Sequence, residues 1–221
     1  MWLQGRDRVP TDYIPLMESW RNVNPSYRYL FWDENSIDGL LCERFSHYVE
    51  QWRKLTPAIK RCDAARCFIL YEFGGIYADL DTQAYRSIDS LISNLELDDY
   101  DIVLSEESKS ATSWKGRLTK SVSNDFIGRK IVSNAIMMSR KRDPFWLEFL
   151  NESFRISSNQ VLESFSTWHL TKFLDKRRAL SKIAVISPKY LLSEADAASA
   201  YATHRYDGTW LDNSKAHPWE V

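Results

Sequence analysis

Apolar residues fall at helical spacing in some parts of the chain and gather in short, strand-like runs in others. The first clear helix is predicted over residues 10–20, where apolar side chains recur every three or four positions. Further helices are predicted over residues 37–55 and 57–73, from residue 144 onward, and over residues 161–174. Residues 85–95 are predicted to form either a helix or turns. Strands are predicted over residues 1–5, 27–32, 76–78, 102–104, 130–139 and 183–186. Because strands and helices alternate, we expect an α/β fold with a single, mostly parallel central sheet flanked by helices, in one domain over residues 1–221.

Two carboxylates follow directly after the predicted helix and strand at the centre of this pattern. Gly74 and Gly75 end the helix, because glycine tolerates the left-handed conformation found after a last helical turn. On a strand, Asp79 and Asp81 would point to the same face. Two such carboxylates repel unless a cation lies between them, so they indicate a site for Mn²⁺ or Mg²⁺. The alternative is a solvated strand-to-turn junction, where Asp is common.

The preceding helix carries a charged pair, Asp63 and Arg66, whose spacing of three places both on one helical face. An ordinary surface ion pair would explain this spacing. The flanking residues are mostly apolar, however, and a charged pair on a buried helix is costly unless it faces a polar cleft. The pair is therefore a candidate for the same cleft as the two carboxylates.

The whole run has a recognisable order. Residues 61–66 read Arg-Cys-Asp-Ala-Ala-Arg, and residues 70–82 read Leu-Tyr-Glu-Phe-Gly-Gly-Ile-Tyr-Ala-Asp-Leu-Asp-Thr. Together they closely resemble the signature of the DXD-motif glycosyltransferases of family 32, over more than twenty positions in order. That family includes initiating α-1,6-mannosyltransferases, inositolphosphoceramide mannosyltransferases, and bacterial and viral relatives. The resemblance implies a GT-A-like fold, a nucleotide-diphosphosugar donor and transfer with retention of anomeric configuration.

The resemblance also implies donor-binding residues outside this run. Trp2 matches a family tryptophan at the end of a first strand that is shorter here than in relatives. Trp32 and Asp33 are expected near the donor, although a core strand followed by a helix cap would explain them equally well. Asn134 interrupts an apolar run and matches a family Asn near the donor sugar. A structural hydrogen bond to a neighbouring strand is its alternative.

A third metal ligand is implied near the end of the chain. His204 is followed by Gly208, Thr209 and Trp210, which resemble the family's C-terminal His with its Gly-Ser-Trp. We therefore expect His204 to bind the cation with Asp81, and we count Trp210 among the donor-binding residues. An imidazole ligand suits Mn²⁺ better than Mg²⁺. A lone surface histidine is the alternative.

The expected mechanism distributes roles over these residues. Asp79 would hold the ribose and orient the ion, Arg66 would contact a donor hydroxyl or phosphate, and Asp63 a sugar hydroxyl. No side chain stands out as a nucleophile. We therefore favour attack by the acceptor hydroxyl on the face from which the diphosphate leaves, without a covalent intermediate.

The charge, cysteine content and apolar runs of the chain limit the kinds of partner and cellular location that we expect. The net charge of −1 and the pI near 6.4 give no electrostatic reason to expect nucleic acid or an anionic membrane as a partner. The chain has an odd number of cysteines, three, without metal-ligand spacing, which favours reduced thiols and a cytoplasmic setting. No apolar run is long enough to span a membrane, so a Golgi location would need an anchor that these residues do not supply.

Two other functions fit parts of the pattern. Phosphatases of the haloacid dehalogenase type also use Asp-x-Asp after a strand. Their motif has Thr or Val two places after the second Asp, whereas here Thr82 follows the second Asp directly. A non-catalytic carbohydrate-binding domain on a transferase fold is the second alternative. For the donor we favour a UDP-sugar over GDP-mannose, with a glycan or glycoconjugate as acceptor. The polar segment 105–128 is expected to be a long loop, either an acceptor-side lid or disordered.

Overall fold

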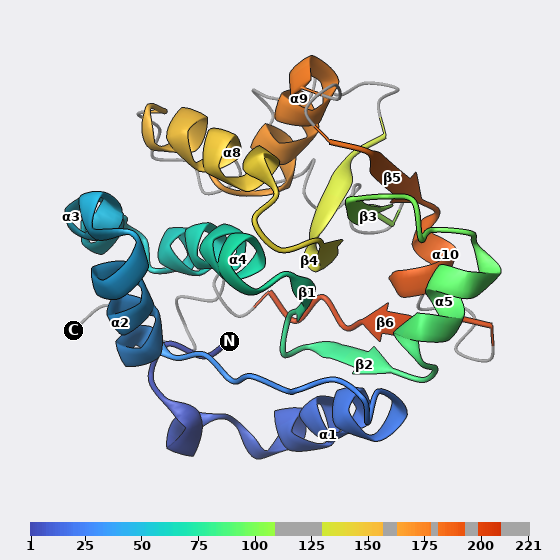
Figure 1. Cartoon of the computed structure of the whole chain (residues 1–221). Coiled ribbons are helices and arrows are strands. Elements are labelled where there is room, and N and C mark those ends of the chain that lie inside the picture. Colours follow the sequence, from blue (N-terminus) through green and yellow to red (C-terminus); the bar gives the residue numbers. More distant parts are fainter. Residues whose placement is uncertain (109–129, 157–162, 178–180, 193–198, 209–221) are drawn as a thin grey trace.

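The computed structural model describes residues 1–108, 130–156, 163–177, 181–192 and 199–208 (Figure 1). The 3₁₀ helices are η1 (Arg6–Arg8), η2 (Thr11–Tyr13) and η3 (Ser46–Tyr48). The α-helices are α1 (Ile14–Val23), α2 (Glu34–Arg44), α3 (Val49–Arg53), α4 (Ile59–Phe73), α5 (Ile88–Asn94), α8 (Pro144–Phe154), α9 (Thr167–Arg177) and α10 (Pro188–Leu191). The strands are β1 (Gly75–Ala78), β2 (Thr82–Ala84), β3 (Ile102–Glu106), β4 (Val132–Ser139), β5 (Ile183–Ile186) and β6 (Ala202–His204).

The central sheet has the strand order β1-β4-β3-β5 and is mixed. The predicted α/β class is confirmed, but the prediction of a mostly parallel sheet is wrong. Strand β4 runs antiparallel to both of its neighbours, β1 and β3, and only β3 and β5 are parallel. The physical reason is burial: helices cover both faces of this sheet, so its antiparallel strands carry the continuous apolar runs that are otherwise typical of parallel strands.

A second, two-stranded antiparallel sheet joins β2 to β6. Neither strand is predicted from the sequence, because each has only three residues. Thr82 pairs with His204 in this ladder, so the chain just after the two carboxylates lies beside the chain near residue 204. The prediction of one domain over residues 1–221 is not tested by these contacts and stays a prediction.

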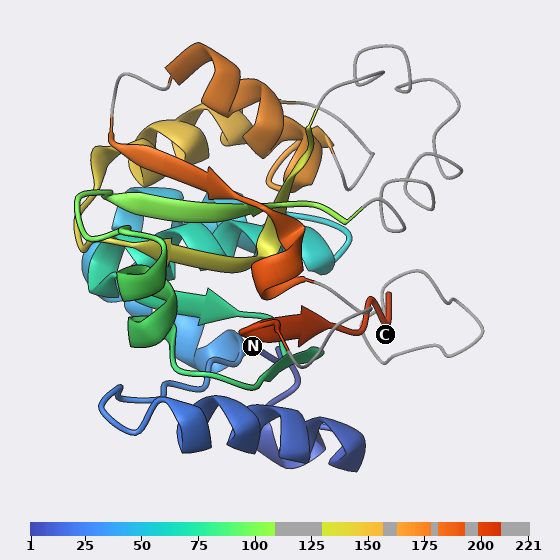
Figure 2. The same ribbon diagram turned by 90° about the vertical axis from the view of Figure 1, so that its right-hand side faces the viewer.

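Helices cover both faces of the central sheet (Figures 1 and 2). One core cluster joins α4, α8 and α9 to alternate sheet residues such as Leu104 and Met137, and another joins α5 and α10 to Val103 and Met138. Neighbouring strand residues therefore point to opposite faces, and both faces are apolar. This explains why these strands read as continuous apolar runs.

Two predicted strands are absent as strands. Residues 27–32 form no ladder. An isolated backbone bond runs from Trp2 N–H to Trp32 O at 3.0 Å, and another from Glu34 N–H, at the start of α2, to Leu3 O at 3.1 Å. Helix α4 ends at Gly74 with φ 66°, as predicted. In the described part of the chain, no helix is both long and apolar enough to cross a membrane.

Candidate functional site

The two carboxylates Asp79 and Asp81 lie in the turn that joins β1 to β2, not on a strand as predicted. Backbone hydrogen bonds fix this turn, because Asp79 N–H donates to Ala135 O at 2.8 Å and Thr82 N–H donates to Asp79 O at 3.2 Å. The indole of Trp20 on α1 donates to the Thr82 hydroxyl at 3.1 Å. The turn is therefore held by the central sheet on one side and by α1 on the other.

His204, the last residue of β6, and the residues that follow it contact Asp81. His204 Nε2 lies 3.0 Å from Asp81 Oδ2, although 123 positions separate the two residues. Arg205 N–H donates to the backbone oxygen of Asp81 at 2.9 Å, and Asp207 N–H donates to its Oδ2 at 3.2 Å. The β2–β6 ladder and these bonds together bring the predicted distant partner to the acidic turn.

The contact between His204 and Asp81 shifts both pKa values. Burial opposes charge on His204, but the hydrogen bond and the negative charge of Asp81 outweigh it and raise the pKa of the imidazole. Burial likewise opposes charge on Asp81, yet the hydrogen bond from His204 and the backbone N–H of Asp207 lower the pKa of that carboxyl. Each group thus stabilises the charged form of the other.

Asp79, Asp81 and His204 form a group that fits a metal ion. One ligand atom from each lies within 4.8 Å of the others. Ligands on opposite sides of one divalent ion are separated by roughly 4 to 5 Å, twice a bond length of about 2.0–2.6 Å. The donor set of two carboxylates and an imidazole suits a divalent cation of the Mn²⁺ type. The buried Nδ1 of His204 lacks a hydrogen-bond partner within the described residues.

Arg66 links the helix α4 to the acidic turn. Its Nη1 lies 3.1 Å from Asp63 Oδ1, and its Nη2 lies 3.0 Å from Asp79 Oδ1. Its Nε donates to the Tyr77 hydroxyl at 3.1 Å, and that hydroxyl donates to Asp79 Oδ1 at 2.8 Å. Asn134 completes the cluster, since its side-chain amide donates to Asp63 Oδ1 and its backbone oxygen accepts from Arg66, both at 3.1 Å.

This arrangement brings four predicted residues together: Asp63, Arg66, Asp79 and Asn134. The side chains of Asp63 and Arg66 are buried, so the expected polar cleft is instead a closed network of hydrogen bonds around Asp79. The alternative for Asn134 is a structural hydrogen bond to a neighbouring strand. Its side chain does form a structural hydrogen bond, but the acceptor is Asp63 on helix α4 and not a strand residue. Direct contact of Asp63, Arg66 or Asn134 with a donor stays a prediction. Sequence reasoning missed Tyr77, although it lies inside the recognised run.

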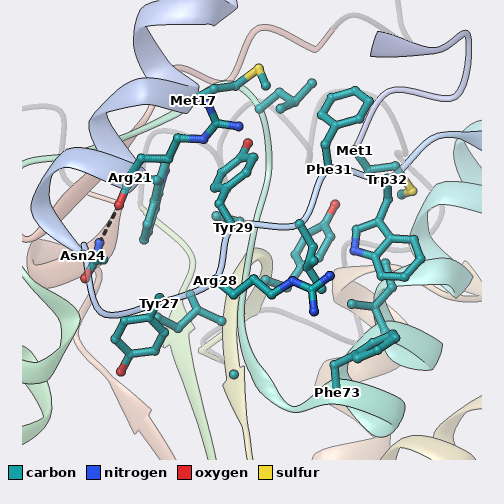
Figure 3. A pocket seen from close by; sticks show the side chains of 18 of the residues that line it. Met1, Met17, Arg21, Asn24, Tyr27, Arg28, Tyr29, Phe31, Trp32 and Phe73 are labelled. Carbon is teal, nitrogen blue, oxygen red and sulfur yellow. Dashed lines mark hydrogen bonds between the residues drawn. The ribbon is translucent and has the colours of Figure 1, made fainter. Parts of the chain in front are cut away.

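A cavity of about 520 Å³ adjoins this cluster and includes Asp79 and Tyr77 in its wall (Figure 3). Tyr29, Phe31 and Trp32 come from the extended segment before α2 and line it together. Trp32 packs against Phe73 with ring centroids 5.4 Å apart. An aromatic wall of this kind suits a flat ring or an apolar group.

The remaining predicted donor residues lie in different places. Trp2 is buried against Tyr13, with ring centroids 5.9 Å apart. Asp33 caps α2, because its Oδ1 accepts a hydrogen bond from Ser36 N–H at 2.9 Å, and the hydrogen bonds from Ser36 lower the pKa of its carboxyl. The helix-cap alternative is therefore confirmed for Asp33, and a donor contact there stays a prediction. Trp210 and most of the 105–128 loop lie outside the described residues.

Comparison with known proteins agrees with the resemblance read from the motif. Residues 10–98 match the family described as "Glycosyltransferase sugar-binding region containing DXD motif". The match includes both carboxylates of the turn and all of α4, so the predicted family resemblance is confirmed over this part of the chain.

Several curated proteins share this segment. Inositol phosphoceramide mannosyltransferase 3 of Schizosaccharomyces pombe is 30% identical over 86 residues, which cover 39% of this chain and 24% of that protein. The initiation-specific alpha-1,6-mannosyltransferase of Candida albicans is 29% identical over 101 residues, covering 43% of this chain and 26% of that protein. An uncharacterised glycosyltransferase of Acanthamoeba polyphaga mimivirus is 29% identical over 89 residues, covering 40% and 36%. The matched segment thus spans about a quarter to a third of these relatives.

Among solved structures, a chain titled "PaToxG Glycosyltransferase" superposes with a TM-score of 0.48 and 15% sequence identity. The superposition covers 76% of this chain and 64% of that one.

Proposed function

We propose that this chain is a metal-dependent glycosyltransferase that moves a hexosyl group from a nucleotide-diphosphate sugar to a hydroxyl of a glycan or glycoconjugate. The observation that carries the proposal is the convergence of Asp79, Asp81 and His204 within 4.8 Å. Two of these residues lie inside the segment 10–98 that matches the DXD family, and the third is 123 positions from Asp81.

In this proposal Asp81 and His204 hold the cation, with Asp79 beside them. Mn²⁺ is favoured over Mg²⁺ because one ligand is an imidazole nitrogen. When bound, the cation neutralises negative charge on the diphosphate as it leaves. The hydrogen bonds described for the Asp79 side chain fall on Oδ1, so we assign Oδ2 to the cation or the donor ribose.

The network around Arg66 orients the Asp79 side chain for this task, because Arg66 and the Tyr77 hydroxyl both contact its Oδ1. Asp63 and Asp79 pair with the Arg66 guanidinium, and Asp81 lies close to Asp79, so the cluster carries an excess of negative charge. Such an excess attracts a cation and repels a bare diphosphate, which makes donor binding dependent on the metal.

We propose retention of anomeric configuration by attack on the departing face. The bond between the anomeric carbon and the diphosphate oxygen breaks, a bond from that carbon to the acceptor oxygen forms, and the acceptor proton passes to the leaving diphosphate. No nucleophile of the protein is needed. Trapping of a covalent glycosyl-enzyme would contradict this mechanism.

The relatives change the preferred donor. Several of them are named mannosyltransferases, which supports a mannosyl donor for this chain as well. Of the donors implied by the resemblance, GDP-mannose is the mannosyl donor. We therefore propose GDP-mannose first and a UDP-sugar second, which reverses the preference formed from the sequence.

Binding and transfer test the proposal together. Unfolding midpoints are measured with Mn²⁺ and each of GDP-mannose, UDP-glucose, UDP-galactose and UDP-N-acetylglucosamine, because a bound ligand raises stability by mass action. We expect GDP-mannose to give the largest rise, and only when Mn²⁺ is present. Release of GDP is then followed with and without a glycan acceptor.

The same measurements separate the alternatives. Turnover of p-nitrophenyl phosphate without hydrolysis of any nucleotide sugar would point to a phosphatase and overturn the proposal. Metal-dependent nucleotide binding without hydrolysis or transfer would favour a non-catalytic binding domain.

A further inference from the structure

The imidazole of His204 lacks the support that metal-binding histidines usually have. In most such sites the second ring nitrogen donates to a carboxylate or carbonyl, which fixes the orientation of the ring. Here Nε2 faces Asp81, and no partner is found for Nδ1 within the described residues. Another contact must therefore set the orientation of this ring.

That contact is the ring of Tyr206. Its centroid lies 4.0 Å from that of His204, with 43° between the ring planes. Both side chains are partly buried, and the tyrosine ring limits rotation of the imidazole on the side it covers.

The backbone of Tyr206 is strained, which indicates that its position is imposed by its surroundings. Its φ is 55°, in the left-handed region that residues other than glycine seldom adopt. This conformation allows Asp207 N–H to turn back to Asp81 Oδ2, at 3.2 Å. Strain of this kind is tolerated where neighbouring contacts hold it, and such residues gather at functional sites.

Glu107 binds the hydroxyl group of Tyr206. The tyrosine hydroxyl donates to Glu107 Oε1 at 3.0 Å. Glu107 is buried, directly follows β3, and its backbone N–H donates to Ile131 O at 2.7 Å. The pair therefore ties the chain after β6 to the end of β3, an inner strand of the central sheet. Burial and the nearby Glu107 raise the pKa of Tyr206, so its hydroxyl stays a donor at neutral pH.

We propose that Tyr206, anchored by Glu107, is a positioning residue that fixes the imidazole of His204 for cation binding. This inference rests on the proposed metal-dependent function. Tyr206 touches neither the cation nor the donor in this role. It acts through His204, as a hydrogen-bonded second partner would do in other metal sites.

The test measures Mn²⁺ affinity of the full chain directly, from the electron paramagnetic resonance signal of free Mn²⁺. Tyr206→Phe keeps the ring and removes the bond to Glu107, Glu107→Gln weakens the same bond from the other side, and Tyr206→Leu removes the ring. Tyr100→Phe serves as a matched control, because Tyr100 is exposed and precedes β3, whereas Glu107 follows the other end of that strand. We expect Tyr206→Phe and Glu107→Gln to weaken Mn²⁺ binding about tenfold, Tyr206→Leu up to about 100-fold, and the control to change nothing.

A second readout separates positioning from a general structural role. The unfolding midpoint without metal should stay nearly constant in Tyr206→Phe, and raised Mn²⁺ should restore its rate of transfer. Unchanged Mn²⁺ affinity in both Tyr206→Phe and Glu107→Gln overturns the inference, even if Tyr206→Leu fails to fold. Failure of the unaltered chain to bind Mn²⁺ overturns instead the proposed function on which the inference rests.

Discussion

Arg66 Nη2 lies 3.0 Å from Asp79 Oδ1, and the same oxygen accepts a hydrogen bond from the Tyr77 hydroxyl at 2.8 Å. Arg66 belongs to α4 and Asp79 to the turn after β1, so this contact fixes the helix and the acidic turn to one another. Since the guanidinium is almost fully buried, its charge is balanced by protein groups and not by water.

Replacing Arg66 by Met should destabilise the protein by about 3–5 kcal/mol, because the buried Asp63 and the partly buried Asp79 would then lose their cation. Arg66→Lys should recover only part of this loss, since an ammonium cannot reproduce the fork of a guanidinium. Urea unfolding of both variants measures the effect. Arg44→Met is the control, because Arg44 forms only an exposed pair with Glu43 and should cost less than about 1 kcal/mol. Equal losses at the two positions would refute the assigned role of Arg66.

Removal of a metal ligand should abolish stabilisation by Mn²⁺. At a Mn²⁺ concentration of about 100 times Kd, the unaltered chain should gain about 2.7 kcal/mol, and a chelator should reverse the gain. Asp81→Asn and His204→Gln should remove most of it, because each deletes one of the three converging ligands. Asp99→Asn, at an exposed position, should retain it. The measurement is the unfolding midpoint against Mn²⁺ concentration. A normal gain in Asp81→Asn would exclude Asp81 as a ligand.

Two glycines should respond in opposite directions to replacement by Ala. Gly74 has φ 66°, and an added Cβ would lie 2.6 Å from the backbone nitrogen of Lys141. Gly74→Ala should therefore destabilise by at least about 1–3 kcal/mol. Gly39 lies inside α2 with nothing within 4 Å of an added Cβ, so Gly39→Ala should stabilise by about 0.5–1 kcal/mol. Chemical denaturation of the two variants is the check, and a neutral Gly74→Ala would show that the backbone there can relax.

His169 should make stability depend on pH in mildly acidic solution. Burial against Phe149 lowers the pKa of its imidazole from 6.5 to about 4, so the folded chain keeps it neutral where the unfolded chain protonates it. The contribution is complete above about pH 6.5 and is lost progressively as the pH falls towards 4, by about 1–3 kcal/mol in total.

The pH effect of His169 is isolated by comparing variants. The difference in unfolding free energy between the unaltered chain and His169→Leu should shrink from pH 7 to pH 4. His47→Gln removes an exposed histidine and should leave the pH profile unchanged. A constant difference across this range would show that His169 does not titrate as described.

Local chemistry made several elements predictable. Asp143 and Pro144 mark the start of α8, and the Asp143 carboxylate accepts a hydrogen bond from Phe145 N–H at 3.0 Å. Gly74 ends α4 because its backbone adopts a left-handed φ. Strand β5 lies over the residues predicted for it, Ile183–Ile186. In each case neighbouring residues are enough to determine the conformation.

Strand pairing was not predictable in the same way. Residues 27–32 have the composition of a strand, yet a cavity lies between them and β1, and no ladder forms within the described residues. Conversely, β2 and β6 are too short to be recognised, and they become strands only by pairing with one another. A strand depends on a partner that the local sequence does not specify.

The sequence by itself determined the pair of carboxylates Asp79 and Asp81, the helix that carries Asp63 and Arg66, and the likeness to a glycosyltransferase family, because these reside in one continuous run of residues. Only the tertiary structure decided that Arg66 and Tyr77 bind the same oxygen of Asp79, that His204 meets Asp81, and that Tyr206 and Glu107 lie behind that histidine. The reason is physical: Arg66 lies 11 positions from Tyr77, and His204 lies 123 positions from Asp81. Contacts at such separations follow from the packing of the two sheets and their helices and not from spacing along the chain.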